Sequence, residues 1–242
     1  MGHPEKTALM RFPCFKAYDI RGRVPAELNP PLAARIGAGT ATLLGLGPVV
    51  PGCDIRLSSL QLRQALVDGF RTSGRDVIDI GLCGTEEVYF QTFLRQAAGG
   101  GVTASHNPMD HNGMKLVGKQ SRPISGDSGL FDSRDYAAGN ITLPSVDGSL
   151  RHDSDKSDHI KHLLGYIDRS ALKPLKIVVN AGNGGAGVVI DQLAAHLPFE
   201  FIRIQHEHGS FPNGLPNPLL PENRNALEYR NPWRRRPAAR QN

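Results

Sequence analysis

A chain of 242 residues with 39% hydrophobic and 21% charged side chains is typical of a globular protein with one large domain or two smaller ones. The net charge of +5 lies almost entirely in residues 225–242, where five arginines and one glutamate contribute +4 and leave +1 for the residues before them. This distribution argues against a basic groove for nucleic acid and predicts a solvated, disordered tail at 225–242.

Three widely spaced cysteines argue against a disulfide framework and against a zinc site built from cysteines. No apolar run approaches the roughly 18 residues that a membrane span requires. The N-terminal residues also lack the apolar segment of a signal peptide. We therefore expect a cytoplasmic protein with no membrane partner.

Helix and strand signals alternate through the first half of the chain. Asn29 before two prolines predicts the N-cap of a helix, and Ser58 with Gln61 predicts a capping box at the start of another. In chain order, the expected elements are a helix at 29–44, a strand at 48–53, a helix at 58–74, a strand at 77–80, a helix from Thr85, a glycine-rich strand at 99–103 and extended chain again at 115–117.

Composition changes after Gly118, because residues 118–153 are rich in Gly, Ser, Asp and Pro. We expect a loop-rich segment there, with a first domain at 1–150 and a second at 151–224. In the second domain we expect a helix at 155–167, a strand at 176–180, a helix at 187–197, a strand at 199–204 and a loop at 209–221. Repeated strand–helix–strand units favour an α/β fold, but two strands are too few to close the second core.

The segment Thr103-Ala104-Ser105-His106-Asn107-Pro108 lies where a strand is expected to end, which is the usual place for ligands in open α/β sheets. Asn-Pro at 107–108 and Asn-Gly at 112–113 are both turn formers and predict an exposed, tightly turned Ser105. Nearby lysine and arginine suit a phosphorylated serine, because they offset a phosphate charge of about −1.5 to −2. The pattern alone leaves open whether Ser105 is a nucleophile or a loop-capping serine.

The Ser105-His106 pair raises the alternative of a hydrolase triad. Neighbouring side chains in extended chain point to opposite faces, so we do not expect these two to hydrogen-bond to each other. A Gly-x-Ser-x-Gly elbow is also missing from the sequence. Both observations disfavour acyl transfer.

Seven motifs occur in a fixed order between about Pro13 and Arg224. They lie at 15–22, 54–56, 84–87, 103–108, 112–115, 122–126 and 217–222. Together they resemble the α-D-phosphohexomutase family, in particular its phosphomannomutase/phosphoglucomutase branch. The resemblance implies a mixed sheet sandwiched by helices, with domain 1 complete and domain 2 incomplete.

The resemblance also implies a reaction. Ser105, once phosphorylated, would donate its phosphoryl group to a mannose or glucose 6-phosphate, and the bisphosphorylated sugar would turn and return its other phosphoryl group. Lys115 would be the general acid/base, Arg21 would bind the phosphoserine, and His106 would position sugar or phosphate. The alternatives are surface salt bridges for Arg21 and Lys115 and a solvated loop residue for His106. Structural roles are expected for three further residues: Tyr18, Asp19 and Arg56, the last as a pairing partner within the sheet.

Two further patterns suggest ligands but are better explained by packing or solvation. Residues 182–187 fit Gly-x-Gly-x-x-Gly, yet Glu200 opens the next strand, where a dinucleotide site needs an acidic residue at its end. By the family resemblance, this segment is similar to a strand–helix turn of the second domain, where glycines allow close packing. The histidine pairs 159/162 and 206/208 lack a third metal ligand, so solvated side chains are expected.

The family resemblance implies Mg²⁺, held by the phosphate on Ser105 and by three aspartates of an Asp-Gly-Asp-x-Asp-Arg loop. This sequence has no such loop and no third or fourth domain. One hypothesis is a mutase chain that is interrupted after Arg224, for example by a change of reading frame, or completed by a second polypeptide; we expect it to be inactive alone. The other is a non-catalytic fragment that binds phosphosugars weakly or associates with another subunit. Neither the preferred sugar nor the oligomeric state follows from the sequence.

Overall fold

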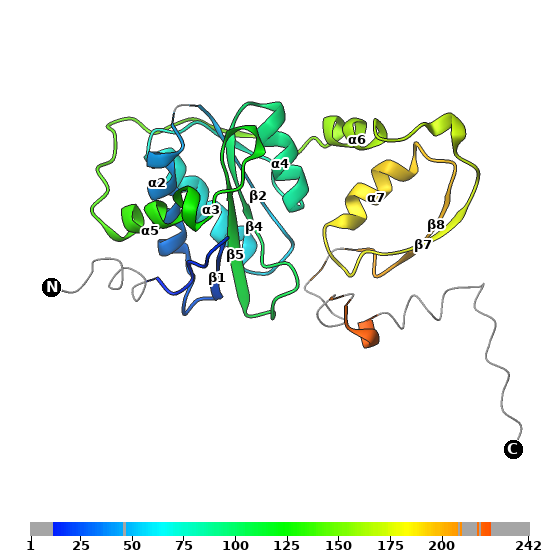
Figure 1. Cartoon of the computed structure of the whole chain (residues 1–242), viewed down its shortest axis with the longest axis horizontal. Coiled ribbons are helices and arrows are strands. Elements are labelled where there is room, and N and C mark those ends of the chain that lie inside the picture. The colour runs from blue at the N-terminus through cyan, green and yellow to red at the C-terminus, as the bar shows by residue number, and fades with distance from the viewer. Residues whose placement is uncertain (1–11, 46, 208, 210–216, 218, 224–242) are drawn as a thin grey trace, which may run out of the picture. The chain divides into compact units, whose positions relative to one another are not determined.

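The computed structural model describes residues 12–45, 47–207, 209, 217 and 219–223. The chain divides into two compact units, Met1–His159 and Ile160–Asn242 (Figure 1). Most of the loop expected at 209–221 and the whole tail expected at 225–242 lie outside the described residues. Within the described ranges, no helix is long and apolar enough to cross a membrane.

The first unit contains a mixed sheet of six strands in the order β1-β5-β4-β2-β3-β6. The strands are β1 Ile20–Arg23, β5 His111–Val117, β4 Ala98–Val102, β2 Val49–Cys53, β3 Val77–Asp79 and β6 Leu150–His152. Strand β5 runs antiparallel to β1 and β4, whereas β4, β2, β3 and β6 are mutually parallel. The carboxyl ends of β2, β3 and β4 therefore meet at one edge of the sheet.

Helices cover both faces of this sheet. Figure 1 shows α2 (Pro30–Leu43), α3 (Ser59–Thr72) and α5 (Phe131–Ala138) on one face, and α4 (Thr85–Leu94) on the other. Two apolar clusters fill the spaces between the layers, one around Phe70 and Met114 and the other around Val88. This arrangement confirms the predicted mixed sheet sandwiched by helices.

The two helix starts predicted from the sequence differ in outcome. The Asn29 side chain accepts a hydrogen bond from the Leu32 amide at 3.0 Å, which confirms the predicted N-cap of α2. The capping box predicted at Ser58 is wrong, because Ser58 makes no side-chain cap bond to α3. Its hydroxyl accepts a hydrogen bond from Asn112 instead, at 2.9 Å.

The segment at 118–153 contains more regular structure than its composition predicts. It includes the short turns of helix Lys119–Ser121 and Gly126–Leu130, the helix α5 and the strand β6. Helix α5 buries Ser133 and Arg134, so it shows no apolar period along its sequence. The Ser133 hydroxyl is 2.6 Å from the Thr40 hydroxyl on α2, so a polar pair forms part of this helix contact.

The second unit contains a parallel pair of strands, β7 (Lys176–Asn180) and β8 (Glu200–Ile204), joined by α7 (Ala186–Ala194). These elements confirm the predicted strand–helix–strand order. A Cβ at Gly187 would lie 2.3 Å from the His206 carbonyl oxygen, which supports the interpretation of the glycine run as a packing motif. Helix α6 (Ser157–Leu164) and the turn Arg169–Ala171 precede β7.

The expectation of solvated histidines is wrong for His159. Its side chain is 3% exposed, and its ring lies 5.3 Å from the ring of Phe90. Beside it, the ammonium of Lys156 donates to both carboxylate oxygens of Glu87 at 2.7 and 2.8 Å. His206 is likewise paired, with Asp191 at 2.9 Å, whereas His208 lies outside the described residues.

Candidate active site at the Ser105 loop

Residues 103–110 connect β4 to β5 and place Ser105 beyond the carboxyl end of β4. Ser105 is exposed and has a φ of 49°, in the left-handed region. The Asn107 backbone and side-chain amides both donate to the Ala104 carbonyl, at 2.9 and 2.7 Å. The predicted exposed turn around Ser105 is therefore confirmed.

The second predicted turn, at Asn112-Gly113, is wrong because both residues lie inside strand β5. A Cβ on Gly113 would lie 2.3 Å from the Ile20 carbonyl oxygen and 2.9 Å from the Thr103 carbonyl oxygen. Glycine is therefore needed here for the close approach of the neighbouring chains, and no turn is made.

Arg56 lies directly beneath the loop and is only 5% exposed. Its Nη2 donates to the carbonyl oxygens of Ser105 at 2.6 Å and Asn107 at 2.7 Å, and its Nη1 donates to those of Pro108 at 2.8 Å and His111 at 3.1 Å. The Asp54 carboxylate is 3.6 Å from the Arg56 Nε. Burial lowers the pKa of Arg56, and the nearby Asp54 carboxylate partly offsets this effect.

Sequence reasoning missed this contact, because it expected Arg56 to pair within the sheet. A signal was nevertheless present. The Asp-x-Arg motif follows β2, and the Ser105 loop follows its parallel neighbour β4. Side chains that follow adjacent parallel strands meet at one edge, so these two segments could have been placed together.

A second chain of hydrogen bonds holds the loop from its amino end. The Thr103 hydroxyl donates to Asp54 Oδ2 at 2.7 Å and accepts from the Ser105 backbone amide at 3.1 Å. Asp54 also accepts hydrogen bonds from the Arg56 backbone amide and the Ser59 hydroxyl. Asp54, the residue that follows β2, thus orients Thr103, two positions before Ser105.

Two of the predicted site residues, Arg21 and Lys115, meet at Asp19. The Asp19 carboxylate accepts a hydrogen bond from Arg21 at 2.6 Å and lies 3.9 Å from the Lys115 ammonium nitrogen. Arg21 pairs with Gly113 across β1 and β5, and the Gly113 carbonyl accepts from the Thr103 amide at 3.0 Å. Strand β1, strand β5 and the segment after β4 therefore connect Arg21 and Lys115 to Thr103, two positions before Ser105.

Asp19 is a buried charge partner of the two cations, with 9% exposure. Tyr18 is 78% exposed, so the structural role expected for it is wrong.

The structure brings Ser105 and His106 together, contrary to the sequence prediction. The Ser105 hydroxyl lies 3.2 Å from His106 Nδ1. The prediction assumed extended chain, whereas the left-handed φ of Ser105 turns the two side chains to the same side. Within the described residues His106 hydrogen-bonds to no carboxylate, so the third member of a hydrolase triad has no counterpart there.

Cys53 ends β2 and directly precedes Asp54, so its thiol is a second candidate nucleophile near this site. It is buried, and desolvation raises its pKa to about 11. Because the thiolate is the reactive form, Cys53 is a poor nucleophile near neutral pH. The exposed hydroxyl of Ser105 is the better placed nucleophile at this edge.

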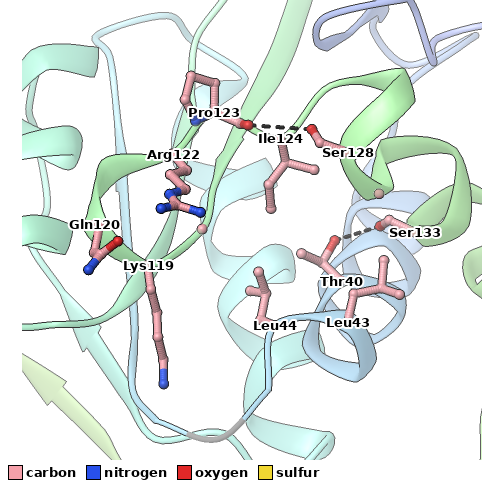
Figure 2. A pocket seen from close by; sticks show the side chains of 12 residues that line it. Thr40, Leu43, Leu44, Lys119, Gln120, Arg122, Pro123, Ile124, Ser128 and Ser133 are labelled. Carbon is pink, nitrogen blue, oxygen red and sulfur yellow. Dashed lines mark hydrogen bonds between the residues drawn. The ribbon is translucent and has the colours of Figure 1, made fainter.

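A cavity of about 400 Å³ lies elsewhere in the first unit (Figure 2). It is lined by the end of α2 with Leu44 and by the segment after β5, which includes Lys119 and Arg122. Val117, at the end of β5, pairs with Gly99 near the start of β4. The cavity therefore lies at the opposite end of β4 from Ser105.

No group of three His, Cys, Asp or Glu that could hold a metal ion occurs within the part of the chain that the structure describes. Mg²⁺ prefers several oxygen ligands in octahedral geometry. The side chains within the described residues therefore do not fit a Mg²⁺ site.

Comparisons with known proteins agree with this architecture. Residues 13–129 match the family described as phosphoglucomutase/phosphomannomutase, alpha/beta/alpha domain I. Over those residues, the chain is similar to the first domain of the phosphoglucomutase/phosphomannomutase family. The matched segment includes Arg21, Arg56, Ser105 and Lys115.

Curated relatives extend this similarity to most of the chain. A protein named phosphohexose mutases from Xanthomonas campestris pv. campestris is 63% identical over 220 residues, covering 90% of this chain and 49% of the relative. A phosphomannomutase from Escherichia coli is 51% identical over 221 residues, covering 86% and 48%. The chain thus spans about half the length of these relatives.

A solved structure gives the same picture of the fold. The crystal structure of a phosphoglucomutase/phosphomannomutase family protein from Burkholderia thailandensis matches with a TM-score of 0.78 and 34% identity. The match covers 88% of this chain and 48% of that one. The mixed sheet and its helices are therefore the architecture of this family.

Proposed function

We propose that this chain carries the phosphoserine relay of a hexose-phosphate mutase, an isomerase that interconverts hexose 6-phosphates and hexose 1-phosphates. The observation that carries the proposal is the Ser105 hydroxyl, exposed on a loop whose carbonyls are held from beneath by Arg56. The Arg21–Asp19–Lys115 cluster on the adjoining strands supports it, because a transferring phosphoryl group needs cationic partners.

In the proposed reaction, a sugar hydroxyl attacks the phosphorus of phosphorylated Ser105. A P–O bond to the sugar forms, the P–O bond to Ser105 breaks, and the proton of the sugar hydroxyl passes to the serine oxygen. The bisphosphorylated sugar turns, and the reverse transfer of its other phosphoryl group restores the phosphoserine. The net result moves one phosphate between two positions of a hexose.

Each side chain has a proposed role in this exchange. Lys115 moves the proton and offsets charge on the transferring group, and Arg21 binds phosphoryl oxygens as a charge-assisted donor. His106, 3.2 Å from the Ser105 hydroxyl, positions the acceptor. Mannose and glucose phosphates both remain candidate substrates.

The test is phosphorylation of the full chain by a hexose 1,6-bisphosphate, located by mass spectrometry of peptides. We expect one added phosphoryl group on Ser105, its loss in Ser105→Ala, and its retention in the control Ser125→Ala, an exchange of another loop serine. Labelling at other serines, or none at Ser105, would overturn the proposal.

Turnover is a separate measurement. We expect the chain alone to be inactive with mannose 1-phosphate or glucose 1-phosphate in the presence of Mg²⁺. Positioning and charge neutralisation supply most of the catalysis in phosphoryl transfer, and this chain spans only about half the length of its relatives. Turnover by the purified chain would contradict that expectation and would identify the preferred sugar.

A further inference from the structure

The guanidinium of Arg56 donates its hydrogen bonds to backbone carbonyls of the Ser105 loop. Its two terminal nitrogens donate to four carbonyl oxygens, all between Ser105 and His111, at 2.6 to 3.1 Å. A planar guanidinium offers a fixed fork of donors, and this geometry suits several acceptors that converge from one loop. The cation therefore sets the direction in which each of these carbonyls points.

The direction of a carbonyl also fixes the direction of the next amide. In a planar trans peptide, the C=O of one residue and the N–H of the following residue point in opposite directions. Because the Ser105 carbonyl points inward to Arg56, the His106 N–H must point away from it. The same holds for the Met109 N–H, which follows the Pro108 carbonyl.

The His106 N–H is also available for an external acceptor. It makes no hydrogen bond to another backbone or side-chain group within the described residues, and His106 is exposed. It belongs to the peptide that follows Ser105, so it lies within a few bonds of the serine hydroxyl. The Ser105 amide is different, since Thr103 already accepts its hydrogen bond.

We propose that Arg56 is a positioning residue that turns the His106 backbone N–H outward, as a hydrogen-bond donor to the phosphoryl group at Ser105. The inference rests on the proposed function for the identity of that group. Backbone donors that are already oriented stabilise developing negative charge without reorganisation. The positive charge of the buried Arg56, behind the loop, also favours a negatively charged phosphoryl group at Ser105.

The first test uses the unmodified full chain labelled with ¹⁵N and titrated with inorganic phosphate. We expect the His106 amide resonance to move during the titration. If phosphate moves the signals of Arg21 and Lys115 while the His106 amide stays fixed, the proposal is wrong. This measurement needs no substitution, so it does not depend on whether a variant folds.

The second test compares Arg56→Lys with Arg134→Lys. Lysine keeps the charge, but its single ammonium cannot span four carbonyls. Arg134 is a suitable control because it is also buried, at 2% exposure against 5% for Arg56, and lies on α5 with Asp135 as partner. We expect Arg56→Lys to weaken phosphate binding about tenfold and to abolish the His106 response, whereas the control stays within about twofold.

Equal phosphate binding and an equal His106 response in the two variants would overturn the positioning role. These results are separable from the test of the proposed function. A chain whose His106 amide responds to phosphate through Arg56, but whose Ser105 never accepts a phosphoryl group, would keep the positioning role and remove the mutase proposal. Phosphorylation of Ser105 without any His106 response would do the reverse.

Discussion

At the scale of single residues, the candidate site depends on its polar side chains and equally on a glycine position, where no side chain would fit. Gly113 lies between β1 and β4, with the Ile20 carbonyl oxygen 2.3 Å from where its Cβ would be. Both neighbouring segments carry site residues, since Arg21 follows Ile20 and Ser105 follows Thr103 by two. A displacement at Gly113 would therefore move both halves of the candidate site.

We predict that Gly113→Ala destabilises the fold by about 1–3 kcal/mol, because the added methyl group displaces backbone on one or both sides. The matched control is Gly101→Ala in β4, where a new Cβ would make an ordinary contact of 3.5 Å with Val88. Urea unfolding of both variants measures the difference. Equal unfolding midpoints for Gly113→Ala and Gly101→Ala would contradict the close approach described here.

The residue types of this site were predictable, but their contacts were only partly so. Ser105 was expected on an exposed turn because Asn107-Pro108 is a strong local signal. The hydrogen bond between Ser105 and His106 was not expected, since it depends on one left-handed φ at a residue that is not glycine. The role of Arg56 depends on contacts about fifty residues away in sequence, which a local pattern cannot contain.

At the scale of elements, local signals predicted well wherever a segment carries a compact apolar run. The strand at Lys176–Asn180 was predicted with its observed bounds, because its apolar run is compact. Helix α5 was missed, because it packs on α2 through the Ser133 and Thr40 hydroxyls and through Arg35, which donates to the Ala137 carbonyl at 2.6 Å. Polar packing of this kind leaves no hydrophobic period in the sequence.

The cap of α2 at Asn29 provides a test at this scale. We predict that Asn29→Ala lowers the free energy of unfolding by about 1 kcal/mol, because the Leu32 amide loses its only side-chain acceptor among the described residues. Asn29→Asp is the control, since an aspartate retains both the cap and a favourable charge at the helix start. Thermal or urea unfolding compares them. An Asp variant as unstable as the Ala variant would mean that the cap bond is not what stabilises α2.

At the scale of the whole molecule, contacts within the first unit order the chain well beyond the end of α5. Strand β6 adds to the sheet beside β3, and Asp153 pairs with Arg95 at 2.9 Å. Lys156 then meets Glu87 on α4, where both side chains are at most 9% exposed. A buried pair of this kind strongly penalises the loss of either partner. The composition of residues 118–153 indicated a loop, yet tertiary contacts, which composition does not reveal, give this stretch its order.

The two units differ in how much of their sheets is buried, and this difference should be visible in hydrogen exchange. All five residues of β4 are buried, whereas β7 and β8 contain only half-buried and exposed residues. Two paired strands with little buried apolar surface are marginal in water, so their backbone amides open more often.

We predict that amides of Ala98–Val102 exchange at least about tenfold more slowly than those of Lys176–Asn180, measured by hydrogen-exchange mass spectrometry on the full chain. The strand β5, buried along most of its length, is the internal reference for a protected strand. Equal protection of β4 and β7 would mean that the second unit gains a cover that the described residues do not supply. If β7 instead exchanges fast in the chain alone, as we expect, adding a polypeptide that corresponds to the other half of the relatives tests what covers it, because protection of β7 that rises on addition identifies that half as its packing partner.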